Sequence, residues 1–431
     1  MSRSLNAGRP TLFATLLFFL LFSGPPSLRL RDPFDSIEGV IDPSVVFQAS
    51  VWVLAGIWTL YQLRKDRCAR LPEVMSLPLP EKLGLLMILF LSASAFVSDA
   101  PLLTAFKVGQ ILVSLLFTWM FVYRYGITRC LDYVLIGSVT LCAAIAISTV
   151  LAPDLVFFLD EGQTRLRGDP IAPLPTVVTY SIILLILKKK QIAEILFWPL
   201  MAGLGTLLAF SVTRHAWFLV IGFIAFYSVR SAKAAFVRKV GYASLCVFPF
   251  LFFFYLLPAL QDYRSTESIG TLTGRTDLWV YLVGITLLRS PWIGLGYYSA
   301  SRTFGIDFNP GMGTAHSTFV EVFLGGGLLS LIPCLALCLL LIRRAISCLS
   351  RRATKQEFAC GTMFLVTMTI GLLGGDFAYG QVGITFWSLA AALPAMRLGH
   401  AVSGAPHGLR LKPSANAGMT PLPGNGRPVE T

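Results

Sequence analysis

Long apolar segments recur along the whole chain, and each is close to the length at which a helix crosses a bilayer, about 15 to 22 residues. Hydrophobic residues make up 55% of the chain and charged residues only 13%, a composition typical of integral membrane proteins. The sequence therefore predicts an all-α polytopic membrane protein with about twelve transmembrane helices. The expected spans are roughly residues 10–24, 44–62, 83–98, 103–122, 131–151, 173–187, 193–211, 215–229, 240–258, 319–342, 359–375 and 382–396.

Basic residues are unevenly distributed among the loops between these spans, and this predicts an orientation. If both ends of the chain lie in the cytoplasm, basic segments such as RKDRCAR, KKK and RRAISCLSRR all fall on the cytoplasmic side. The net charge of +13 then belongs to a membrane face near anionic lipid, and no pattern for nucleic-acid binding is present.

Residues 1–397 form the expected membrane domain. Residues 398–431, rich in Gly, Pro and Ala, are expected to form a disordered cytoplasmic tail.

The basic residues expected on the opposite, outer face are all arginines. Lysine falls on the cytoplasmic side, except for Lys107 inside the fourth expected span. Chance explains this pattern as well as function does, because Arg outnumbers Lys in the chain. The functional interpretation is that a planar guanidinium binds phosphate through two contacts, which an ammonium does less well. The outer arginines are Arg29, Arg31, Arg165, Arg167, Arg214, Arg264, Arg275, Arg289 and Arg302.

The expected outer face has two long loops, residues 152–172 and 259–318. A loop as long as the second usually folds over a functional surface. Within it, residues 276–289 predict an interfacial helix, because Asp277 near its start and Arg289 near its end complement the helix dipole. Ionisable side chains beside lipid cost desolvation free energy, so this loop is a candidate functional region.

Cysteine and histidine placement predicts neither a disulfide nor a metal site. All eight cysteines fall in expected spans or on the cytoplasmic side, so no disulfide is expected on the outer face. The four histidines are scattered, and no cluster of His, Cys and carboxylates has the spacing of metal ligands. We therefore expect no metal and no cofactor.

Four motifs follow one another along the expected outer face: RLRGDPIAP, SVTRHAW, TGRTDLW with SPWIGLGYY, and AHSTFVEVFLGGGLLSL. Their order over residues 98–330 resembles that in the O-antigen ligase and polysaccharide polymerase superfamily of bacterial inner membranes. The S-x-[ST]-R pattern matches residues 211–214, the GRxxxW pattern matches residues 274–279, and the HNxxL-like pattern falls on His316. In the last motif Ser317 stands where the family usually has Asn, and Phe319 also departs from the usual pair, which leaves substrate choice open.

The resemblance implies a metal-independent GT-C-like glycosyltransferase of lipopolysaccharide or exopolysaccharide biosynthesis. Its donor would be a glycan on undecaprenyl diphosphate, and its site would face the periplasm. Arg214 and Arg275 would stabilise the diphosphate charge, and His316 would act as general base on the acceptor hydroxyl. The further candidates for diphosphate or substrate binding are Arg167, Arg165, Trp279, Glu321 and Asp376.

Each candidate also has a structural interpretation. Arg214 can extend toward lipid headgroups, and His316 can simply begin the tenth expected span. Arg165 and Arg167 can pair with acids of their own loop, and Asp376 can cap the last span.

A twelve-helix secondary transporter or a flippase for lipid-linked glycans is the alternative from another class. Such folds usually have related halves and broken or charged helices at mid-membrane, whereas the halves of this chain do not resemble each other. A structural subunit without catalysis would leave the Arg and His arrangement unexplained. The sequence does not separate ligation to a lipid A core sugar from polymerisation onto a lipid-linked repeat, because both reactions use the same donor.

Overall fold

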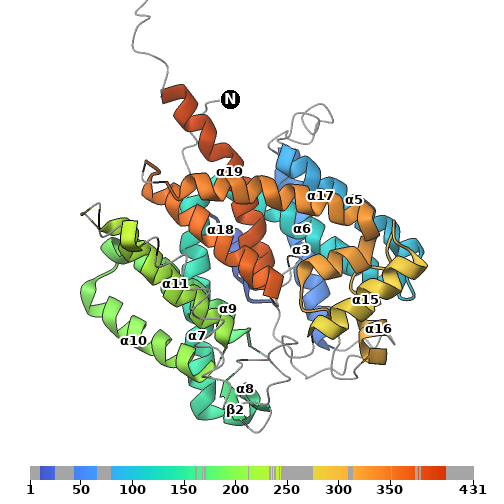
Figure 1. Ribbon diagram of the computed structural model, residues 1–431, viewed down its shortest axis with the longest axis horizontal. Coiled ribbons are helices and arrows are strands. Elements are labelled where there is room, and N and C mark those ends of the chain that lie inside the picture. The colour runs from blue at the N-terminus through green and yellow to red at the C-terminus, as the bar shows by residue number, and fades with distance from the viewer. Residues whose placement is uncertain are drawn as a thin grey trace, which may run out of the picture.

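The computed structural model describes residues 10–24, 43–65, 79–160, 163–166, 171–211, 213–232, 275–308, 314–350, 352–373 and 380–403, with positions 168, 234, 236, 239–241, 243 and 377 between them. Within these ranges the regular structure is helical apart from an antiparallel hairpin of β1 (Phe157–Asp160) and β2 (Gln163–Leu166), and turns and irregular segments connect the elements (Figure 1). The helices are α1 (Leu12–Ser23), α3 (Pro43–Lys65), α5 (Leu79–Ala93), α6 (Pro101–Tyr125), α7 (Ile127–Leu151), α8 (Pro153–Val156), α9 (Leu174–Lys188), α10 (Glu194–Ser211), α11 (Arg214–Ser231), α15 (Arg275–Arg289), α16 (Ser299–Phe308), α17 (Thr318–Cys348), α18 (Lys355–Leu373) and α19 (Gly380–Ser403).

Every expected span except residues 240–258 coincides with a helix, and most of that segment lies outside the described residues. Seven of the helices are long and apolar enough to cross a membrane: α3, α5 with the turn after it, α6, α7, α10, α17 and α18. Helices α1 and α11 are apolar but shorter. The described chain is thus a helical protein with seven candidate membrane helices, and the count of twelve spans stays a prediction.

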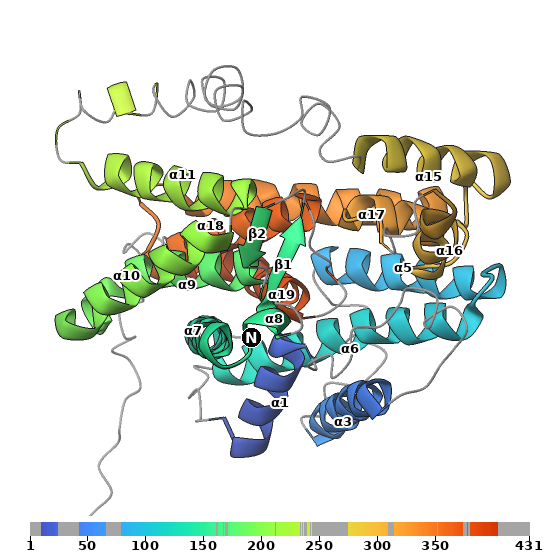
Figure 2. The ribbon, with the colours of Figure 1, turned by 90° about the horizontal axis from the view of Figure 1, so that it is seen from below.

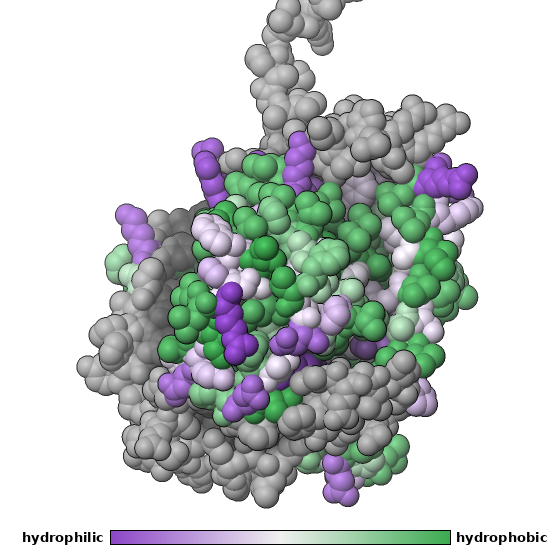
Figure 3. Space-filling view, turned by 90° about the vertical axis from the view of Figure 1, so that its right-hand side faces the viewer, coloured by the Kyte–Doolittle hydropathy of each residue, from purple (hydrophilic) through white to green (hydrophobic). Residues whose placement is uncertain are grey.

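Large apolar side chains are exposed on the outer surface of this bundle, and their contact with water would cost free energy. Large apolar side chains project from several helices, among them Phe96 (92% exposed), Leu102 (86%) and Ile195 (81%). Green, apolar side chains cover much of the described part of the face in Figure 3, with hydrophilic ones scattered among them. Exposed apolar area on this scale is typical of a surface that contacts lipid.

Cationic residues gather at one end of the bundle, which we call the basic end. Arg124 at the end of α6 contacts Gln62 of α3, and Lys188 at the end of α9 pairs with Asp132 of α7. Arg230 of α11 donates to the Leu349 carbonyl in the α17–α18 turn, at 2.6 Å. The described cations that we assign to the basic end lie near helix ends or in the turns between helices. They are Arg64, Lys65, Arg124, Arg129, Lys188, Lys189, Lys190, Arg230, Arg343, Arg344, Arg352 and Lys355.

Helix α17 is broken near its start, where Gly327 has non-helical torsions (φ 59°, ψ −157°). The segment of residues 291–296 runs beside this break and pairs with it through the backbone. The Leu295 N–H donates to the Leu324 carbonyl at 2.7 Å, and the Leu328 N–H donates to the Pro291 carbonyl at 2.9 Å. Lipid offers no hydrogen bonds, so an unwound membrane helix needs such protein partners. Figure 2 shows α15, which precedes this segment, beside α17, with α5 and α6 below.

We predict that Gly327→Ala destabilises the protein. A Cβ atom at this position would stand 2.4 Å from the Trp292 carbonyl carbon, and φ is positive. This backbone conformation is adopted almost only by Gly and costs a residue with a side chain about 1–3 kcal/mol. Thermal unfolding of the purified variant in detergent should therefore begin several degrees below that of the wild type.

Gly222→Ala in α11 is the matched control, because a Cβ there meets open space and Ala favours helix. Equal melting temperatures for the two variants would show that the break at Gly327 tolerates a side chain.

Candidate functional site

The starts of α11, α15 and α17 meet the end of α18 on the side of the bundle opposite the basic end. Arg275, the first residue of α15, donates from Nη1 to the Leu373 carbonyl at the end of α18, at 2.5 Å. Its charge also acts on His215 in the first turn of α11. The starts of α11 and α15 and the end of α18, which are far apart in the sequence, therefore lie together at this end.

Ala315 is held between two side chains from different helices. Its carbonyl accepts from Trp279 Nε1 of α15 at 2.6 Å, and its N–H donates to Glu321 Oε1 of α17 at 2.7 Å. Ala315 is fully buried and Glu321 is only 3% exposed, so both hydrogen bonds form away from solvent. We call this arrangement the Ala315 clamp.

His316 follows the clamp directly and adopts a left-handed backbone conformation, with φ 52°. Few residues other than Gly adopt it, and where they do the surrounding contacts hold them there. Ser317 is the N-cap of α17, so His316 stands just before the helix rather than in its first turn. Its side chain is half-buried. The clamp thus fixes the position from which the imidazole projects.

The spacing of Arg275 and Trp279 explains the GRxxxW motif in structural terms. Residues four apart in a helix lie on the same face, so both side chains project from one face of α15. Arg275 contacts the end of α18 and Trp279 contacts the segment before α17. A helix expected at 276–289 is present as α15, with Asp277 in its first turn and Arg289 in its last, and its place in the membrane interface stays a prediction.

Sequence reasoning passed over His215, which follows the predicted Arg214. Burial and, to a lesser extent, the nearby Arg275 charge lower the pKa of His215 to about 4. The imidazole lies at the beginning of α11, outside the seven candidate spans, and it is neutral at neutral pH. Arg214 is the first residue of α11. The two predicted arginines therefore open two helices whose starts meet.

The remaining predicted site residues are less fully described. Arg165 lies on β2, where its Cα pairs with that of Phe158. Arg167 and Asp376 lie outside the described residues. Their predicted contacts with substrate stay predictions.

A buried cation on α6 lies near this end and contacts the GLGYY motif, residues 294–298. Lys107 is 8% exposed, and its ammonium stands 4.3 Å from the centre of the Tyr298 ring. A cluster of hydroxyl groups also joins α16 to the start of α6. The Ser299 hydroxyl forms hydrogen bonds with the hydroxyls of Ser98 at 2.7 Å and Thr104 at 2.9 Å. Lys107 thus packs on an aromatic ring inside the bundle.

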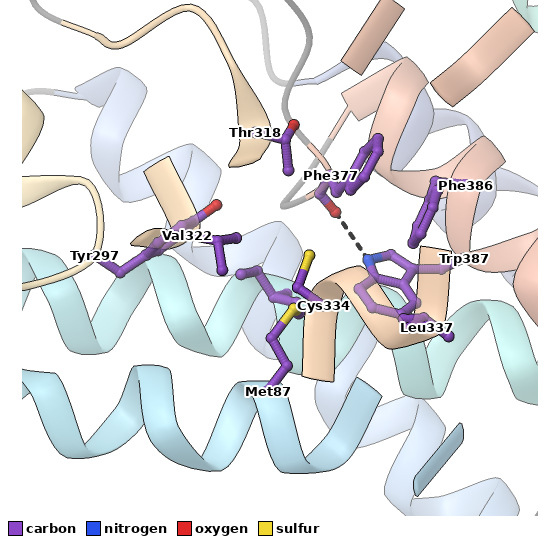
Figure 4. Close-up of a pocket in the computed structure, with 10 residues that line it drawn as sticks. Met87, Tyr297, Thr318, Val322, Cys334, Leu337, Phe377, Phe386 and Trp387 are labelled. Carbon is purple, nitrogen blue, oxygen red and sulfur yellow. Dashed lines mark hydrogen bonds between the residues drawn. The ribbon is translucent and has the colours of Figure 1, made fainter. Parts of the chain in front are cut away.

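A small apolar cavity lies inside the bundle behind the start of α17 (Figure 4). Met87, Val322, Leu337 and Phe386 are among the residues that line it, and its volume is about 10 Å³. That is space for about one water molecule. This cavity is too small to hold a sugar.

Among the described residues, no three or more His, Cys, Asp or Glu side chains stand close enough to hold a metal ion. Independence from metal nevertheless stays a prediction, to be tested by chelation. Comparison with protein-family models and with curated proteins gave no match to this chain. The function must therefore be argued from the site itself.

We predict that Glu321→Ala destabilises the start of α17, whereas Glu321→Gln is tolerated. The Ala variant leaves the buried Ala315 N–H without its acceptor, which costs about 1–3 kcal/mol. Glutamine retains a side-chain carbonyl that accepts the same bond. Unfolding of the two purified variants in detergent measures the difference, and an equally stable Ala variant would contradict the clamp.

Proposed function

We propose that this protein is a glycosyltransferase of the O-antigen ligase or polysaccharide polymerase type. It transfers a glycan from an undecaprenyl-diphosphate donor to a saccharide acceptor at the periplasmic face of a bacterial inner membrane, with the basic end in the cytoplasm. The observation that carries the proposal is the meeting of the starts of α11, α15 and α17. These starts bear Arg214, Arg275 and His316, and the contacts of Arg275 and the Ala315 clamp link them.

Arginine provides the donor side of this chemistry. When the glycosidic bond breaks, negative charge grows on the diphosphate, and fixed guanidinium groups stabilise it without reorganising. The bond from Arg275 to the Leu373 carbonyl orients its planar fork in advance. The lowered pKa of the neighbouring His215 keeps its imidazole uncharged at neutral pH, so His215 adds no positive charge beside Arg275.

His316 provides the acceptor side. In the proposed step an acceptor hydroxyl oxygen attacks the anomeric carbon of the donor glycan, and His316 takes the hydroxyl proton. The bond between the anomeric carbon and the diphosphate oxygen breaks, and undecaprenyl diphosphate leaves with the electron pair. The clamp suits this role, because a general base must be held within hydrogen-bond reach of the proton.

The contacts of Trp279 and Glu321 lead us to assign them a different task from direct substrate binding. Each has a polar atom committed to Ala315, the residue before His316. We assign both as positioning residues for the imidazole. The acceptor is either a lipid A core sugar or a second lipid-linked repeat, and neither nucleic acid nor a cofactor takes part.

One observation favours the alternative function. A broken helix within a candidate membrane span, as at Gly327 of α17, is a feature of secondary transporters. A transporter or flippase would move the lipid-linked glycan across vesicle membranes without making a new glycosidic bond.

The direct experiment combines the purified protein with an undecaprenyl-diphosphate glycan, each candidate acceptor in turn, and a chelator throughout. Formation of a glycosylated acceptor with release of undecaprenyl diphosphate supports the transferase. The acceptor that reacts distinguishes ligase from polymerase. Translocation of the donor with no new glycosidic bond supports the transporter, and activity restored only by a divalent cation contradicts the metal-free step.

For His316→Ala we expect normal membrane accumulation, retained donor binding and a transfer rate lower by roughly two to four orders of magnitude. The arginines remain in this variant, so the donor still binds. His407→Ala, in the expected tail, is the control and should transfer at the wild-type rate. A near wild-type rate for His316→Ala would remove the general-base role.

For Arg275→Lys we expect loss of most transfer activity although the positive charge is kept. Lysine cannot bind both the Leu373 carbonyl and a phosphate oxygen with a planar fork. Arg289→Lys, in the last turn of the same helix, is the matched control. Similar transfer rates for the two variants, at equal membrane levels, would show that Arg275 acts only as a charge.

A further inference from the structure

A cavity of about 200 Å³ lies at the basic end, in the turn that joins α17 to α18. In Figure 1 this turn lies at the upper left, whereas α15 and α16 of the candidate site lie at the lower right. The volume is below the roughly 300–1,000 Å³ of pockets that enclose drug-sized ligands, so it suits a small polar group. The residues that line it include Arg344, Ser347, Arg352, Glu357, Leu393 and Met396.

Arg344 brings a cation to this cavity under unusual conditions. Its Nη1 is shielded from solvent and has no hydrogen-bond acceptor among the described residues. A shielded donor on a charged group costs more free energy than a neutral one, unless an anion accepts from it. Arg352, which is exposed, adds a second guanidinium to the same lining.

Glu357 is the acid among the lining residues, and it is already engaged in the turn. Its Oε2 accepts from the Thr354 N–H at 2.7 Å, and its own N–H donates to the Thr354 hydroxyl at 3.2 Å. This reciprocal pair is a capping box that begins α18. Two guanidinium groups against one engaged carboxylate leave the lining with a positive charge.

The turn is braced from outside by α11. Arg230 donates to the Leu349 carbonyl at 2.6 Å, and its guanidinium stands 3.9 Å from the centre of the Phe358 ring. These contacts hold the end of α17 and the start of α18 in a fixed relation. The backbone of the turn that bears the cavity is therefore braced before any ligand binds.

An exposed apolar stripe on α17 leads along the helix to this cavity. Ile332, Leu335, Leu339 and Ile346 are 59%, 41%, 66% and 57% exposed. Spacings of three, four and seven residues place them on one helix face. Ile346 adjoins Ser347, which lines the cavity. An anionic head in the cavity could thus continue into apolar chains along α17.

We propose that this cavity binds the phosphate of an anionic phospholipid, with Arg344 as its main contact and Arg352 as its second. Arginine and phosphate form short, charge-assisted hydrogen bonds, often two at a time. Basic pockets between helices at a membrane face are suited to anionic headgroups. The apolar stripe on α17 favours the lipid over free phosphate as the source of the group. This site is separate from glycan transfer and does not depend on it.

The test titrates the purified, delipidated full-length protein with three probes: dioleoylphosphatidylglycerol, dioleoylglycerol and inorganic phosphate. Native mass spectrometry counts the bound lipid, and thermal unfolding in detergent reports its affinity. We expect saturable binding of the phosphatidylglycerol, none of the dioleoylglycerol, and weak competition by inorganic phosphate. Arg344→Gln should weaken phosphatidylglycerol binding at least about tenfold, Arg352→Gln less, and Arg343→Gln, an exposed neighbour outside the lining, not at all.

The outcomes separate cleanly. Inorganic phosphate that binds as tightly as the lipid, and is lost in Arg344→Gln, keeps the phosphate site and identifies free phosphate as its source. Unchanged phosphatidylglycerol binding in both Arg344→Gln and Arg352→Gln overturns the proposal, as does equally tight binding of dioleoylglycerol. If Arg344→Gln fails to accumulate, the exposed Arg352→Gln decides by the same comparison.

Discussion

Backbone pairing at the break in α17 is the constraint on which the candidate site depends. Gly327 interrupts the helix, and the freed backbone groups nearby pair with residues 291–296. Lipid would leave such groups unsatisfied, so the break and its partner segment must occur together. Because residues 291–296 follow α15 directly, the same pairing brings α15 alongside α17. The first turn of α15 then reaches the start of α17, and Trp279 meets Ala315.

The contacts around His316 separate positioning from chemistry. Trp279 and Glu321 act on the backbone of Ala315, and Ala315 in turn fixes His316 in a conformation that few residues adopt. Arg275 is oriented by a carbonyl at the end of another helix. Helices rather than flexible loops therefore hold the polar groups, a requirement of any site that must hold a reactive group in one geometry.

The two ends of the bundle differ in the way they use charge. At the basic end, cations lie at helix ends, pair with neighbours such as Asp132, and, as Arg344 and Arg352, line the cavity. At the opposite end fewer cations are described, and Arg275 and Lys107 each lie against a specific partner inside the protein. An excess of Lys and Arg at one end is typical of one face of a membrane protein. A functional site instead needs single cations, each held by a specific partner.

The sequence by itself determined the helical class, the positions of the apolar segments and the presence of a helix at about residues 276–289, because length, hydropathy and charge placement act locally. It also pointed to Arg275 and His316 through short motifs. Only the tertiary structure decided that Glu321 binds a backbone N–H, that His215 stands beside Arg275, and that Lys107 packs on Tyr298. Those facts arise from contacts between residues far apart in the chain, and no local pattern encodes which buried polar groups will meet.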